Sequence, residues 1–129
     1  MHGHFLFDAR FFLYFEDMDL CFRAKTAGYK SVICKKAAFQ RMCNGTLGEK
    51  NPLTFYYLTR NLFLFVKKQY PDKSLQRDRF KRIFKALRWD VFGYYFPMFL
   101  KTKKINYIHI VFKMAQGSLD FFRGKFGGI

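Results

Sequence analysis

The hydrophobic and polar positions of the first fifty residues predict a short mixed segment. Residues 11–15 form an uninterrupted apolar and aromatic run, which is typical of a strand or another buried element. A helix is predicted over residues 18–27, with Asp17 as its N-cap and Gly28 as the left-handed residue that ends it. Residues 29–34 then alternate as a short strand does. This pattern predicts an α+β segment.

The rest of the chain predicts helices. After a polar loop over residues 35–50, Asn51 and Pro52 supply the cap and first turn of a helix over residues 53–66 that is apolar nearly all round. Ser74 is the predicted cap of the next helix. Its apolar stripe recurs at i, i+3, i+4, i+7 and i+11, on Phe80, Ile83, Phe84, Leu87 and Val91.

Two residue types that disrupt helices follow this stripe. Gly93 and Pro97 are expected to break the aromatic stretch over residues 91–100. A last helix is predicted over residues 104–122, before a basic, Gly-rich end. The chain therefore divides into an α+β segment, residues 1–50, and a helical tail, residues 51–129.

The chain is strongly basic. The 129 residues carry 24 Lys and Arg against 9 Asp and Glu, a net charge of +15. Such a chain is suited to an acidic partner, such as a nucleotide, a nucleic acid or an anionic membrane. The acids are concentrated early, at Asp8, Glu16, Asp17 and Asp19.

Two features bear on the cellular compartment. The longest stretch without a charged side chain is residues 91–100, too short to span a bilayer, and no signal peptide is recognisable at the start. Cys21, Cys34 and Cys43 are odd in number and form no CxxC pair, which favours a reducing compartment. We expect a cytoplasmic protein.

The cluster Glu16-Asp17-x-Asp19 is the strongest candidate for chemistry. A carboxylate held by backbone on both sides can act as a general base if it lies within hydrogen-bond reach of the proton it takes. The alternative is that Asp17 caps the helix and its neighbours form a solvated first turn.

The same cluster lies within a longer pattern. Residues 7–29 contain FD-x-x-FF-x-Y-x-ED-x-DL-x-x-R-x-x-x-x-GY. This segment resembles the hallmark segment of family 2 glycosyltransferases, in particular the rhamnosyltransferase-like members with a GT-A fold. Residues 52–68 resemble the family's YY-x-x-RN helix, and the Gly-rich end resembles that of many members. The resemblance implies the C-terminal, acceptor-side part of a GT-A α/β catalytic domain, followed by a helical tail.

The resemblance also implies roles for individual residues. Asp17 corresponds to the general base that deprotonates the acceptor hydroxyl in an inverting transfer, with Glu16 as its neighbour. Asp19 is expected to fix the helix start. Arg23 is expected to pair with the carboxylates or reach towards phosphate, since an Arg fork suits either. Arg41 falls where many relatives carry a His, so Asp19, Arg23 and Arg41 are the candidate substrate-binding residues.

The donor side is not accounted for. The family binds its nucleotide-sugar with an upstream half whose Asp-x-Asp pair holds Mg²⁺ or Mn²⁺, whereas the one Asp-x-Asp here is Asp17-Met18-Asp19 of the other motif. We therefore expect a metal for the full-length enzyme but see no metal site in this chain. The chain alone is expected to be inactive towards a nucleotide-sugar and a glycan or lipid-linked acceptor.

The rival interpretation is a small basic binding protein. Residues 74–91 combine an apolar stripe with a cationic face, and aromatic residues follow over residues 89–100. Both features suit an anionic membrane surface, such as the inner face of the plasma membrane. Nucleic acid is the less favoured partner, because no recognised nucleic-acid motif is present.

Overall fold

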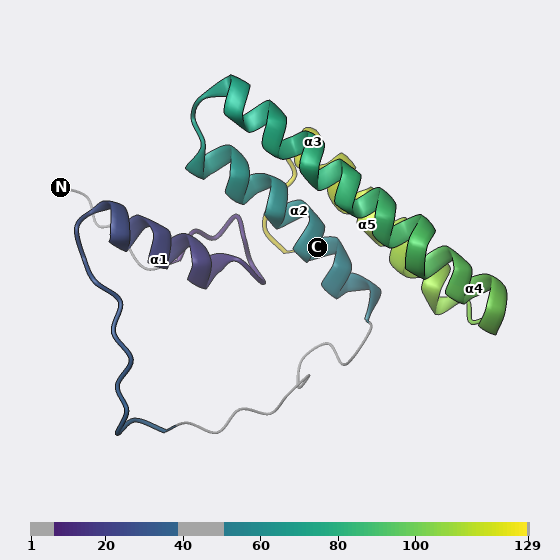
Figure 1. Cartoon of the computed structure of the whole chain (residues 1–129), viewed down its shortest axis with the longest axis horizontal. Coiled ribbons are helices and arrows are strands. Elements are labelled where there is room, and N and C mark those ends of the chain that lie inside the picture. The colour runs from purple at the N-terminus through teal and green to yellow at the C-terminus, as the bar shows by residue number, and fades with distance from the viewer. Residues whose placement is uncertain (1–6, 39–50, 129) are drawn as a thin grey trace.

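The structure, a computed structural model, describes residues 7–38 and 51–128. Its helices in chain order are α1 (Glu16–Thr26), α2 (Pro52–Gln69), α3 (Lys73–Asp90), the π-helical turn η1 (Val91–Tyr95), α4 (Phe96–Thr102) and α5 (Asn106–Phe122). The described residues contain no strand. The predicted α+β class is therefore wrong for this part of the chain, which is helical. Figure 1 shows α1 beside the layer formed by the later helices.

Both predicted strands fail for a physical reason. Residues 11–15 form a tight loop in which Phe12, Tyr14 and Phe15 have φ values of 57°, 66° and 70°. These angles belong to the left-handed region, which bulky side chains rarely adopt and which a strand excludes. Residues 29–34 do run without helix, but Val32 and Ile33 are 86 % and 93 % exposed. A strand requires a neighbouring strand to take its N–H and C=O groups, and the described residues provide none there.

The core lies between α2 and α5, which run in the same direction. Where the first half of α2 meets the second half of α5, a Cβ added to Gly117 would lie 2.5 Å from the Tyr56 carbonyl oxygen, so the two backbones meet there without an intervening side chain. Further along, the Phe63 and Phe121 rings stack with their centroids 5.3 Å apart. The buried core comprises Phe11, Phe63, Leu64, Val66, Ile83 and Phe121.

Helix α3 continues through η1 into α4 as one long helical rod along the same layer (Figure 1). The expected break at Gly93 and Pro97 is wrong. Pro97 has no N–H, so the Gly93 carbonyl loses its usual donor four residues on. The rod accommodates this with a wider turn, in which the Phe96 N–H donates to the Val91 carbonyl, five residues back. Lys103, with φ 56°, then ends the rod.

The helix ends test the predicted caps. The Asn51 side chain accepts from the Leu53 N–H at 2.9 Å with Pro52 in the first turn, as predicted. Gly28 has φ 89° and, with Tyr29, closes the end of α1 by hydrogen bonds to Lys25 and Ala24. Both predictions are confirmed, because these caps depend only on near neighbours.

Two other cap predictions are wrong. Ser74 is not the N-cap of α3. Asp72 is, and its carboxylate accepts from the Ser74 and Leu75 N–H groups at 2.8 Å each. Asp17 is not the N-cap of α1, because the helix begins at Glu16, two residues before the predicted start, with Phe15 at the cap position and no side-chain cap. The expectation that no segment spans a membrane agrees with the helices of residues 7–38 and 51–128, none of which is long and apolar enough to cross one.

Candidate functional site

The candidate site is the first turn of α1 and the loop that leads into it. Glu16, Asp17 and Asp19 all lie in that turn. The N-terminal end of a helix carries unpaired N–H groups and a partial positive charge, which favour carboxylates. The three acids nevertheless have different surroundings.

Asp17 is exposed to solvent. One carboxylate oxygen accepts from the Met18 N–H at 2.7 Å, which holds the side chain against its own helix turn. This carboxylate is the one of the three that a hydroxyl group in solvent can approach without displacing another part of the protein.

Glu16, beside it, is half-buried. Its Oε2 atom is buried and has no hydrogen-bond partner among the described residues. A buried acceptor without a partner costs about 1–3 kcal/mol. Glu16 and Asp17 together therefore offer one accessible and one sheltered carboxylate at adjacent positions.

Asp19 is fully buried and its carboxylate is occupied. It accepts from the Arg23 Nε, the Lys68 Nζ and the Gln69 Nε2, each at 2.8 Å. The two predicted substrate-binding residues, Asp19 and Arg23, are thus brought together, but they bind each other. Asp19 joins α1 to the end of α2, with both carboxylate oxygens buried and engaged by protein donors.

The ion-pair network extends to the residue that starts the sequence pattern. The Lys68 Nζ also donates to the Asp8 carboxylate at 2.8 Å, and Arg10 pairs with Asp8 at 2.6 Å. Hydrogen bonds from Arg10, and then from Lys68, hold the pKa of Asp8 well below its usual range, against the opposing effect of partial burial. Lys68 therefore ties the loop and α1 to α2 at once.

The loop itself is held by a neighbouring pair on α2, Arg60 and Asn61, both fully buried. The Asn61 Nδ2 lies 2.6 Å from the Phe11 carbonyl oxygen, 2.7 Å from that of Leu13 and 3.0 Å from that of Tyr14. The Asn61 amide group therefore binds the backbone of the strained loop just before Glu16.

Arg60 reaches further, to both ends of the described chain. Its Nη2 donates to the carbonyls of Arg10 and Phe11 at 3.1 and 3.3 Å, and its Nη1 donates to that of Gly127 at 2.7 Å. The guanidinium also lies 5.4 and 5.0 Å from the ring centroids of Tyr56 and Tyr57. Arg60 and Asn61 are thus positioning residues for the loop that leads to the carboxylates.

Sequence reasoning missed the roles of Arg60, Asn61 and Lys68. A signal was present, since Arg60 and Asn61 are the polar residues that interrupt an otherwise apolar helix, and a charged residue in such a helix needs internal partners. Arg41, the remaining candidate, lies outside the described residues.

No group of three or more His, Cys, Asp or Glu that could hold a metal occurs within the described ranges. At the one Asp-x-Asp, Asp17-Met18-Asp19, both oxygens of the buried Asp19 carboxylate already accept hydrogen bonds from protein side chains. Comparisons of the chain with protein-family models, curated proteins and solved structures gave no match.

Proposed function

We propose that this chain carries the acceptor side of an inverting glycosyltransferase, with Asp17 as the general base. The observation that carries the proposal is the exposed Asp17 carboxylate, which follows a strained loop. The Phe11 carbonyl of that loop accepts hydrogen bonds from Arg60 and Asn61. Strained backbone costs free energy and persists where the surroundings enforce it, often at functional sites. The resemblance of residues 7–29 to the family 2 hallmark segment points to the same residue.

The proposed reaction is a single displacement. The Asp17 carboxylate takes the proton of the acceptor hydroxyl while that oxygen forms a bond to the anomeric carbon of the donor sugar. The bond from the anomeric carbon to the nucleoside diphosphate breaks on the opposite face, and the diphosphate leaves with the electron pair. The configuration at the anomeric carbon is inverted. Glu16 is the neighbour of Asp17 in the first turn of α1, with one carboxylate oxygen, Oε2, buried in the protein.

In this proposal Asp19 and Arg23 have a structural role. Asp19 and Arg23 act within the protein, as an ion pair that fixes α1 on Lys68 and Gln69, and not as substrate ligands. Donor binding is assigned to no described residue. In this proposal the nucleotide-sugar site, with its metal, is supplied from outside the chain, so the chain alone does not transfer sugar.

The test is the substitution Asp17→Asn in the longest reading frame that contains these residues. General-base catalysis contributes about 10²–10⁴-fold, so kcat should fall by that factor while KM for donor and acceptor stays within about twofold. The measurement is transfer from a panel of nucleotide-sugars to glycan and lipid-linked acceptors. Asp78→Asn, which removes an equal charge from an exposed position on α3, is the matched control and should leave kcat unchanged.

Two results would contradict the proposal. One is an Asp17→Asn enzyme with undiminished kcat, which would leave Asp17 as a helix-start charge only. The other is transfer by the purified 129-residue chain without any other polypeptide, which would place the donor site inside it.

A further inference from the structure

The rod formed by α3, η1 and α4 presents large apolar side chains to solvent. Trp89 is 77 % exposed and Phe92 is 66 % exposed, and Phe96 and Leu100 are exposed at 42 % and 50 %. These four residues follow one another along the rod, with the π-helical turn η1 between Trp89 and Phe96. None of them belongs to the core between α2 and α5.

Helix α5 adds a second apolar stripe to this layer. The exposed members of the stripe, including the residue just before the helix, are Ile105, Ile108, Phe112, Leu119 and Phe122. Between the rod and α5 lies an apolar groove of about 470 Å³, lined by Phe84 and Leu87 on one side and by Ala115 and Leu119 on the other. The apolar surface is therefore broad and spans both elements.

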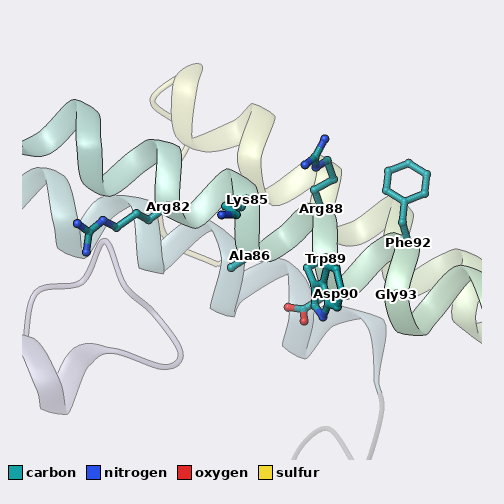
Figure 2. Close-up of a pocket in the computed structure, with 8 residues that line it drawn as sticks. All are labelled: Arg82, Lys85, Ala86, Arg88, Trp89, Asp90, Phe92 and Gly93. Carbon is teal, nitrogen blue, oxygen red and sulfur yellow. The ribbon is translucent and has the colours of Figure 1, made fainter.

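Cations border this apolar surface. A shallow hollow of about 810 Å³ along the rod is lined by the cations Arg82, Lys85 and Arg88, by Trp89 and Phe92, and by one acid, Asp90. Figure 2 shows the three basic side chains in series along α3, ahead of the two aromatic ones. Among the described residues, no carboxylate forms an ion pair with any of these three cations. Residues 73–104 as a whole contain ten Lys or Arg and two Asp.

We propose that this basic–aromatic face, consisting of Arg82, Lys85, Arg88, Trp89 and Phe92, docks onto an anionic lipid bilayer. Trp and Phe side chains insert at the level of the headgroups, where the ring contacts the acyl chains. Lys and Arg side chains attract the anionic lipids. This inference does not depend on the proposed transferase activity, because it uses none of the residues around Asp17.

Charge selects the bilayer over the other occupants. A second copy of the chain brings the same +15 charge, so two such faces repel each other. RNA would neutralise the cations, but it would leave the aliphatic and aromatic stripes without an apolar partner. A bilayer supplies both the negative surface and the apolar layer beneath it.

Trp89 makes the test direct, since it is the one tryptophan of the chain. A Cβ added to Gly93 would lie 3.6 Å from the Trp89 indole, so the ring lies along the rod next to Gly93, at the proposed contact surface. We expect its fluorescence to shift to the blue with vesicles of phosphatidylcholine containing about 30 % phosphatidylserine, and to be quenched by lipids brominated in the upper acyl chain. Pure phosphatidylcholine should give a much smaller shift, and about 0.5 M NaCl should weaken binding to the anionic vesicles.

Substitutions separate the two components of the face. The triple variant Arg82→Gln, Lys85→Gln, Arg88→Gln should reduce partitioning into anionic vesicles by roughly 100-fold, given what each basic residue contributes at such a surface. Phe92→Ser should reduce it about tenfold through lost apolar insertion. The matched control changes Lys30, Lys35 and Lys36 to Gln, the same loss of charge at exposed positions away from the rod. Circular dichroism of every variant checks that the helices are retained.

Several outcomes would overturn the proposal. If the control triple variant loses as much affinity as the Arg82 set, attraction is a property of total charge and not of this face. If Trp89 is not quenched by brominated lipid while the protein binds the vesicles, another surface makes the contact. Equal salt-sensitive binding to single-stranded RNA through the same three cations would assign the face to nucleic acid. A dimer in sedimentation analysis that Phe92→Ser dissociates would assign it to a second copy.

Discussion

Arg60 is a fully buried cation whose partners are backbone carbonyl oxygens, the Asn61 side-chain oxygen and two tyrosine rings, and no carboxylate of residues 7–38 or 51–128 forms an ion pair with it. Burying a charge is costly unless it is hydrogen-bonded. Carbonyl oxygens and the negative faces of aromatic rings meet that need without adding a second buried charge. The arrangement means that the strained loop beside Arg60 and the cation stabilise each other.

Asn61 allows this interdependence to be measured. Asn61→Ala removes the donor that lies within 3.0 Å of the Phe11, Leu13 and Tyr14 carbonyls. We expect the free energy of unfolding to fall by about 2–3 kcal/mol, because buried carbonyls lose their donor. Urea unfolding measures the change, and hydrogen exchange should show faster opening of residues 11–14. The control, Thr102→Ala, removes an exposed hydroxyl that donates to the Met98 carbonyl and accepts from the Lys104 N–H at a long 3.4 Å, and it should change stability by less than about 0.5 kcal/mol. Equal effects of the two substitutions would refute a special role for Asn61.

Asp8 makes the stability depend on pH. Its pKa is lowered in the folded chain by Arg10 and Lys68, so its contribution is fully present above the pKa of an unfolded Asp, about 4. The contribution is lost as the pH falls further, towards the folded pKa. Asp8→Asn should therefore cost about 1 kcal/mol at pH about 6, an amount usual for ion pairs open to solvent, and the gap to the parent should close as the pH falls below about 4.

The measurement is urea unfolding of both proteins over that pH range. Asp78→Asn serves as the control, because its ion pair with Lys81 is long, at 3.9 Å, and exposed. A gap for Asp8→Asn that stays constant down to pH about 2 would show that the carboxylate acts through its shape and not through its charge.

At the scale of the elements, the sequence predicted the positions of the main helices, but the two strands that it predicted do not form in the described residues. The caps at Asn51 and Gly28 depend on neighbouring residues, so a local pattern was enough to identify them. A strand depends on a partner elsewhere in the chain, and the apolar run 11–15 instead found its partners on α2. The same limitation applies to Pro97, since the pattern shows that a normal turn fails there but not that a π-helical turn replaces it.

The contact of α2 with α5 gives a sharp test at this scale. Gly117→Ala would place a Cβ 2.5 Å from the Tyr56 carbonyl oxygen and 3.3 Å from the Arg60 nitrogen, both backbone atoms that cannot rotate away. We expect a loss of about 2 kcal/mol or more from overpacking, despite the better helix propensity of Ala. Gly93→Ala is the matched control, because its Cβ would meet the Trp89 ring at an ordinary 3.6 Å. Thermal unfolding of both variants measures the difference, and a neutral Gly117→Ala would show that the two helices can move apart freely.

At the scale of the whole molecule, the sequence showed the acidic cluster of the candidate site, but it did not show which distant residues bind it. The cluster at Glu16, Asp17 and Asp19 is visible as a pattern of acids in a basic chain. Asp19 differs from its neighbours because its carboxylate accepts hydrogen bonds from Lys68 and Gln69, about fifty positions away along the chain. Such long-range partners follow from packing, and packing is not encoded in any short motif.

The position of Arg60 also has a mechanical consequence. Arg10 and Phe11, near one end of the described chain, and Gly127, near the other, are hydrogen-bonded to the same guanidinium, and the Gly127 N–H donates to the Arg10 carbonyl at 3.2 Å. Tension applied between the two ends would therefore load these few bonds before it reached the helix pair. They would open one after another, as a zipper does, at low force. The resistance of α2 and α5 to sliding would come into play only after the loop before Glu16 had been released.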